Sequence, residues 1–146
     1  MKKAILLVAT IFLFSCSNSD DNSENLNLFG KWTPEVETDY TSNGQISSQS
    51  FYSEEPCYRM STYEFTSNGQ FIARTFDQVQ NNCTQNTIEI LNYTLASNVL
   101  SFSGENIDEE DLLIETRIIE NTQDVLKLKK TYQGNAYTVL EYSKVD

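Results

Sequence analysis

Apolar and polar residues alternate along most of the chain from Phe29 onward, and turn signals interrupt the alternation at short intervals. A period of two is typical of β-strands that bury one face. Leu126 and Leu128, for example, alternate with lysines, which predicts a strand with one face in water. Nine strands are predicted, at residues 31–41, 46–52, 58–66, 71–79, 87–96, 99–103, 112–120, 124–132 and 136–145.

Short turn motifs separate these strands. Asn-Gly occurs at residues 43–44 and 68–69 and is the strongest short hairpin signal, because both central positions of a type I′ turn require positive φ. Leucines and acidic residues at 109–121 are also compatible with a helix, but the β-branched residues at 114–119 favour a strand. We therefore predict an all-β fold of successive antiparallel hairpins, either an up-and-down barrel or a sandwich.

The first 27 residues break this pattern. Lys2 and Lys3 precede an almost wholly apolar run at residues 4–14, and the small residue Ser15 follows it. This layout predicts a secretory signal peptide at residues 1–15 rather than a buried N-terminal helix. Residues 16–27 are mostly polar and acidic and bury too little apolar surface to fold, which predicts a disordered tether. The folded domain is therefore expected at residues 28–146.

The tetrad Leu-Phe-Ser-Cys at residues 13–16 resembles the lipobox of bacterial lipoproteins. The resemblance implies that the Cys16 sulfur carries a diacylglycerol and that Cys16 becomes the acylated N-terminus, held in the membrane by its acyl chains. The acidic pair Asp20 and Asp21 resembles an export signal of surface lipoproteins in some Gram-negative bacteria. Together these imply a bacterial outer membrane lipoprotein, with both the periplasmic face and the cell surface open as locations.

Charge narrows the range of partners. The chain has 21 acidic and 10 basic residues and a net charge of −11, and loss of the leader removes two of the lysines. Nucleic acid is not expected as a partner, because phosphate binding depends on clustered lysine and arginine. Anionic headgroups are also repelled, so membrane association rests on the acyl chains. The length suits one domain, and we expect a monomer.

The chain contains no histidine, which excludes Ser-His-Asp and Cys-His catalysis and histidine-based metal sites. A hydrolase built on paired carboxylates stays open, since their separation in space cannot be read from sequence. Nothing in the sequence argues for an enzyme or a cofactor. The acidic segment at residues 104–111 lacks EF-hand spacing, so we predict a solvated loop and no metal site.

Cys57 and Cys83 are the two cysteines of the expected domain. An exported chain meets an oxidising compartment, which predicts a disulfide between them. A metal site is the alternative, but two thiolates without histidine fall short of the usual four ligands. The disulfide would join the start of the third predicted strand to the end of the fourth, which lie side by side in a hairpin.

Three segments carry a resemblance to a known fold. Residues 28–32, LFGKW, resemble the Gly-x-Trp opening of lipocalins, and YEFTSNGQF at 63–71 and YTLASNVLSF at 93–102 are similar to hairpins of the lipocalin-like domain of bacterial lipoproteins. The resemblance implies an antiparallel up-and-down β-barrel of about eight or nine strands, with Trp32 closing one end. A barrel of this size either fills its interior with side chains or holds one small ligand.

The resemblance also implies that the barrel binds a small, largely apolar molecule at its mouth. Five aromatic residues are the candidate contacts: Tyr63, Phe65, Phe71, Tyr93 and Phe102. Alternatively these rings pack a solid core, and the domain is an accessory module whose outer face meets a protein or glycan partner. A cavity of several hundred cubic ångströms would favour the ligand carrier, and a filled core the surface module.

Overall fold

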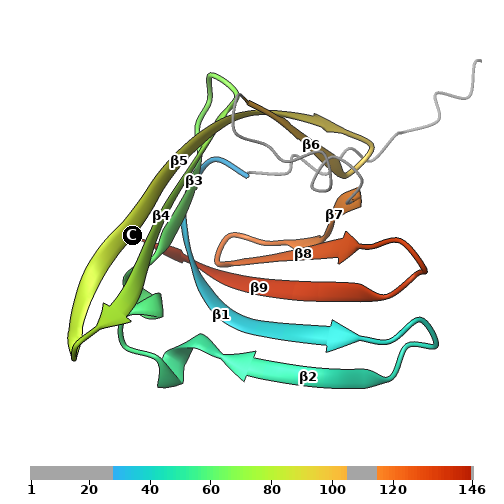
Figure 1. Ribbon diagram of the computed structural model, residues 1–146. Helices are drawn as coiled ribbons and strands as arrows, with labels where there is room; N and C mark the ends of the chain where they lie inside the picture. Colours follow the sequence, from blue (N-terminus) through green and yellow to red (C-terminus); the bar gives the residue numbers. More distant parts are fainter. Residues whose placement is uncertain (1–27, 105–114, 146) are drawn as a thin grey trace, which may run out of the picture.

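The computed structural model describes residues 28–104 and 115–145, which form one antiparallel sheet of nine strands (Figure 1). The strands are β1 (Gly30–Tyr40), β2 (Ile46–Phe51), β3 (Thr62–Phe65), β4 (Gln70–Val79), β5 (Asn82–Ala96), β6 (Val99–Ser103), β7 (Glu115–Asn121), β8 (Val125–Thr131) and β9 (Tyr137–Val145). Two short 3₁₀ helices, η1 (Tyr52–Glu54) and η2 (Tyr58–Met60), lie between β2 and β3. The prediction of an all-β fold is confirmed.

The sheet closes into a barrel because β1 pairs with β9 as well as with β3 and β2. Along one edge, residues 31–40 of β1 pair with β9. Along the other edge, residues 30–32 pair with β3 and residues 36–40 with β2. The closed ring therefore consists of eight strands, β1 and β3 to β9, and β2 extends the sheet beside the second half of β1. In Figure 1, β5 and β6 curve across the side of the barrel opposite β1 and β2.

The predicted antiparallel β-barrel is thus confirmed, with one departure from a simple meander. β2 and β3 follow one another in the chain but share one edge of β1 instead of pairing with each other. The ring, its closing β1–β9 ladder and its disulfide all lie within residues 28–145. In this described part of the chain, neither of the 3₁₀ helices nor any other helix is long and apolar enough to cross a membrane.

The third strand begins later than predicted. Residues 58–60, expected in a strand, form η2, and β3 starts at Thr62. The backbone of this segment is satisfied without a ladder, because Met60 N donates to Cys57 O at 3.0 Å and the Thr33 hydroxyl donates to Ser61 O at 3.2 Å. The alternation of large side chains at 58–65 is therefore the reason why the strand was predicted to begin too early.

The fifth strand begins earlier than predicted, at Asn82 instead of residue 87. β4 and β5 continue to pair past a register shift between Arg74 and Phe76, and the turn between them is made by Gln80 and Asn81, both with positive φ. Asn82 and the following cysteine, expected between the strands predicted at 71–79 and 87–96, consequently lie in the ladder. For the seventh strand, β7 confirms a strand from Glu115, whereas residues 112–114 and the acidic segment beyond Gly104 lie outside the described residues.

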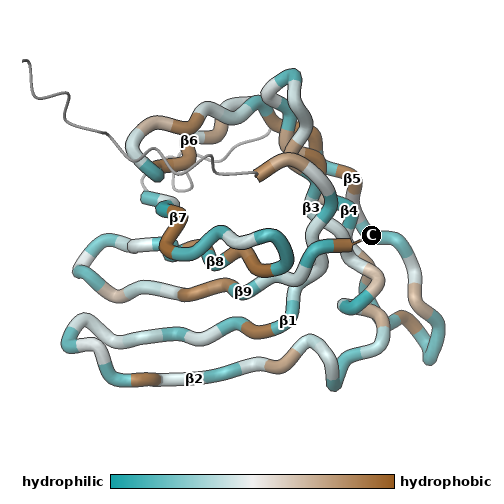
Figure 2. The backbone as a smooth tube through the Cα atoms, turned by 180° about the vertical axis from the view of Figure 1, so that it is seen from behind, coloured by the Kyte–Doolittle hydropathy of each residue, from teal (hydrophilic) through white to brown (hydrophobic). Residues whose placement is uncertain are grey.

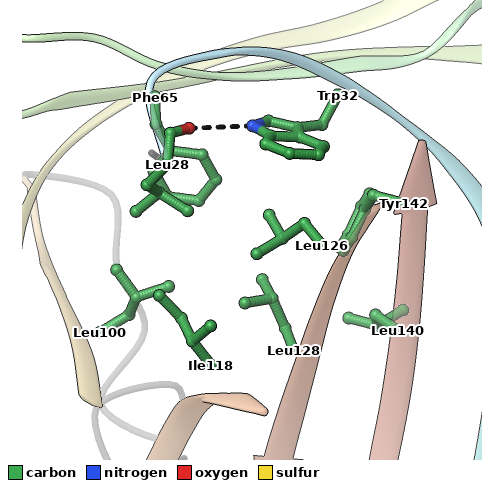
Figure 3. Packing of buried hydrophobic residues seen from close by; sticks show 9 residues of the cluster. All are labelled: Leu28, Trp32, Phe65, Leu100, Ile118, Leu126, Leu128, Leu140 and Tyr142. Carbon is green, nitrogen blue, oxygen red and sulfur yellow. Dashed lines mark hydrogen bonds between the residues drawn. The ribbon is translucent and has the colours of Figure 1, made fainter. Parts of the chain in front are cut away.

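The hydrophobic core gathers around the start of β1, where Trp32 is fully buried (Figure 3). Its indole Nε1 donates to Leu28 O at 2.9 Å, which satisfies the one polar group that the ring would otherwise bury unpaired. The buried cluster comprises Leu28, Trp32, Phe65, Leu100, Ile118, Leu126, Leu128, Leu140 and Tyr142. Hydropathy alternates along β8 in Figure 2: Leu126 and Leu128 are buried between partly exposed lysines, as predicted for a strand with one wet face.

Cys57 and Cys83 form the predicted disulfide. Its location differs from the prediction, because Cys83 belongs to β5, opposite Gln78 of β4, and Cys57 precedes η2. The bond therefore ties the helical segment between β2 and β3 to the β4–β5 hairpin. It closes a loop with a sequence separation of 26 residues.

We expect the double variant Cys57→Ser/Cys83→Ser to fold with a free energy of unfolding lower by about 3.5 kcal/mol, the chain-entropy value for a loop of this length. Urea unfolding followed by circular dichroism measures the difference. Wild-type protein treated with a reductant should show the same loss. Equal stability of the double variant and the oxidised wild type would contradict the expectation.

Candidate functional site

The interior of the barrel contains an open cavity of about 730 Å³. This volume lies within the range of about 300–1,000 Å³ that is typical of small-molecule sites. Every strand of the ring contributes to its lining, and η1 adds Tyr52. The interior is therefore hollow, which favours the ligand-carrier interpretation of the sequence over the filled core.

One wall of the cavity is aromatic. Four of the five candidate residues line it, namely Tyr63, Phe65, Phe71 and Phe102. Phe71 lies at the centre of this wall, with ring centroids 6.0 Å from Tyr63, 5.0 Å from Phe65 and 5.1 Å from Phe102. These contacts join β3, β4 and β6 into one apolar surface, which we call the aromatic wall.

The fifth candidate, Tyr93, is not among the residues that line the cavity. Its ring stands edge-on to Phe65, with centroids 5.2 Å apart, and its hydroxyl donates to Thr66 O at 3.1 Å. Tyr93 thus supports the aromatic wall and fastens it to the β3–β4 turn. Contact of a ligand with any of the five residues stays a prediction.

A carboxylate, Glu37, also lines the cavity, and the sequence analysis missed it. Counting by twos from the inward Trp32 places Glu37 on the outer face. The register of β1 with β9 shifts between Pro34 and Val36, however, so one extra residue is inserted into β1. Such a bulge moves the following side chains to the opposite face. Pro34 was the available signal, because proline cannot donate to a ladder and is confined to strand edges and bulges.

Three tyrosines surround this carboxylate. The Tyr52 hydroxyl donates a hydrogen bond to Glu37. Tyr63 of β3 and Tyr142 of β9 flank β1, with their rings edge-on at a centroid distance of 5.4 Å. We call Glu37, Tyr52, Tyr63 and Tyr142 the Glu37 cluster. Only Tyr63 was a sequence candidate; the cluster forms because β9, β1 and β3 are neighbours in the closed ring.

The hydroxyls of the Glu37 cluster hold their protons. Burial raises the pKa of Tyr142 well above its usual range, and the nearby phenols and Glu37 add to the effect. Burial is also the main cause of the raised pKa of Tyr52, followed by its hydrogen bond to Glu37, and of the raised pKa of Tyr63, on which Glu37 acts as well. All three side chains are therefore neutral phenols at physiological pH.

The charges that line the cavity are unbalanced. Among the described residues that line the cavity, the carboxylates of Glu89 and Glu115 join Glu37, against one ammonium group, that of Lys130. Glu115 forms an ion pair with Arg117 at 3.2 Å on the exposed side of β7. No group of three acidic or cysteine side chains within residues 28–104 and 115–145 is arranged to hold a metal ion. The arrangement suits reversible binding of a molecule with an apolar body and a polar group.

Comparison with known proteins adds one finding. A sequence profile of the family described as "Lipocalin-like domain" matches residues 28–128, from the segment before β1 into β8. No curated protein sequence matches the chain.

The raised tyrosine pKa values predict a loss of stability in alkali. Since the folded protein holds these phenolic protons above the usual value of 10.0, it binds more protons there than the unfolded chain. The stabilisation is complete below about pH 10 and is lost as the pH rises further, by up to about 1.4 kcal/mol per pH unit for each tyrosine.

Urea unfolding measured by circular dichroism from about pH 8 to about pH 11.5 tests this expectation. Tyr142→Phe should make the alkaline slope shallower, because it removes one titrating group. A free energy of unfolding that stays constant up to about pH 11 would contradict the assignment.

Proposed function

Since the chain belongs to the lipocalin-like domain family, we propose that its barrel binds a small, largely apolar molecule in the central cavity. The observation that carries the proposal is the cavity of about 730 Å³ at the centre of the barrel, where a purely structural domain would have packed side chains. The aromatic wall offers a ligand flat apolar surface, and the Glu37 cluster offers it hydrogen bonds and charge.

The size of the cavity limits the number of atoms in the ligand, and this number sets the expected affinity. At about 0.3 kcal/mol per non-hydrogen atom, a ligand of about 20 such atoms binds with about 6 kcal/mol, which corresponds to a Kd of about 40 μM. Binding rather than catalysis is the proposed activity. It is supported by the fold family and by the complete lack of histidine in the sequence.

Native mass spectrometry of residues 17–146 is the direct test of a carried ligand. An added mass that survives gentle conditions and is lost on denaturation supports the proposal and permits identification of the molecule. A neutral apolar dye, Nile red, then reports binding through its fluorescence.

We expect Thr75→Trp to weaken Nile red binding by about tenfold or more, because Thr75 lines the cavity and an indole there occupies ligand space. Thr94→Trp is the matched control, since Thr94 is exposed and does not line the cavity. Equal dye affinity in the two variants, together with a ligand-free mass, would contradict the proposal.

A second function is favoured by one feature of the outer surface. Ile88 and Ile90 flank the cavity-lining Glu89 on β5, and they are 52% and 58% exposed on the opposite face of the strand. Apolar side chains repeated along an outer face fit an accessory module that meets a protein or glycan partner. If the protein is isolated without a ligand and binds no dye, this outer surface becomes the proposed binding site.

We further propose that the mature chain begins at Cys16 and is held by acyl chains in the bacterial outer membrane. Support comes from the order of the two lysines, the apolar run and the lipobox-like tetrad. These residues lie outside the described part of the structure. The charge of the remaining chain repels anionic headgroups, so the acyl chains are the proposed source of membrane affinity.

Expression of the full chain in a Gram-negative bacterium tests the anchor. We expect wild-type protein in the membrane fraction with an acylated Cys16 as its first residue, and Cys16→Ser as an unacylated precursor. The variant Cys57→Ser/Cys83→Ser keeps Cys16 and should be acylated like the wild type. Identical N-terminal masses for Cys16→Ser and the wild type would rule out the lipobox interpretation.

A further inference from the structure

Glu37 carries a charge that its surroundings leave uncompensated. The side chain is half-buried and lines the cavity. Its hydrogen bond comes from the neutral phenol of Tyr52, and none of the ion pairs formed by the described residues includes Glu37. A carboxylate withdrawn from water without a cation is costly, and a barrel that needed only a core would have an apolar side chain there.

Tyr142 is a second polar group on the cavity wall. Only 7% of the residue is exposed, and it lines the cavity. A tyrosine hydroxyl in a cavity wall can donate a hydrogen bond to a ligand or accept one from it. A polar group of a ligand that enters beside Glu37 would therefore find this hydroxyl as a further partner.

The chemistry of the Glu37 cluster indicates the sign of the charge that a bound polar group would carry. Neutral phenol oxygens accept hydrogen bonds from an N–H group, and tyrosine rings attract cations through their faces. Glu89 lies close enough to Tyr63 to act on its pKa, so a second carboxylate adds negative potential beside the cluster. Of the lining carboxylates among the described residues, Glu115 is paired with Arg117, so an anionic head group in the cavity would face Glu37 and Glu89 without a compensating ion pair.

We infer that the ligand is a cationic amphiphile, whose protonated amine binds Glu37 among the three tyrosines while its apolar body lies on the aromatic wall. This inference rests on the proposed ligand-binding function and names the class of molecule that the same cavity takes. The ammonium group forms an ion pair with Glu37 and donates to the Tyr142 oxygen. The hydrocarbon displaces water from Phe65, Phe71 and Phe102.

Displacement of Nile red from residues 17–146 by three probes with one hydrocarbon chain tests the inference. The probes are dodecylamine, dodecanol and dodecanoate at neutral pH, each below its micelle concentration. We expect dodecylamine to bind about tenfold more tightly than either of the others. Glu37→Gln should abolish most of this preference and weaken the binding of dodecanol far less than that of dodecylamine.

Glu54→Gln is the matched control, since Glu54 is exposed, does not line the cavity and removes the same charge from an acidic protein. It should leave the preference for the amine intact, which separates a specific contact from general attraction of cations. Tyr142→Phe provides a second, milder variant that retains the ring, and it should weaken dodecylamine binding more than dodecanol binding.

The outcomes distinguish the two levels of the proposal. Equal affinities for the three probes, tighter binding of dodecanoate, or an amine preference that survives both Glu37→Gln and Tyr142→Phe would overturn the inference and leave the apolar cavity site standing. Failure of Nile red and of all three probes to bind would overturn the proposed function, and the inference with it.

Discussion

The ladder between β1 and β9 is the constraint on which the rest of the structure depends. It joins the first and last strands of the domain along nearly the whole length of β1. Without it, both strands would present unpaired edges, and the interior of the sheet would open to water. Burial of Trp32, the central cavity and the meeting of Tyr142 with Tyr63 across β1 all require this closure.

Within β1, a single extra residue decides what the cavity contains. Trp32 and Glu37 are five positions apart, so an uninterrupted strand would place them on opposite faces. The bulge at Glu35 turns both inward, and the Ser143 hydroxyl donates to the displaced Glu35 side chain at 2.6 Å. One strand thereby supplies the indole that anchors the core and the carboxylate that gives the cavity its charge.

A hollow barrel forgoes packing contacts that a filled one would make, and the remaining structure offsets this loss. The core around Trp32 concentrates apolar burial near the start of β1, and the Cys57–Cys83 bond holds η2 against the β4–β5 hairpin. Tyr52 enters the Glu37 cluster from η1. An ionised carboxylate in a cavity conflicts with stability, and such conflicts in a folded domain are expected at functional sites.

The sequence by itself determined what depends on neighbouring residues. Alternation along residues such as 125–131 and the Asn-Gly turns were sufficient for the existence of the nine strands and for the inward direction of Tyr63, Phe65, Phe71 and Phe102, because side-chain direction in a regular strand follows from local geometry. They were not sufficient for the starts of β3 and β5. Cysteine chemistry was sufficient for the disulfide.

Tertiary structure alone decided that β2 and β3 share an edge of β1, that Cys83 lies in β5, and that Glu37 faces inward beside Tyr52 and Tyr142. These features result from pairing between distant strands and from a bulge that reverses the alternation, so no local pattern contains them. The same holds for the cavity, because whether the inward side chains of eight strands meet or leave space depends on the closed ring as a whole.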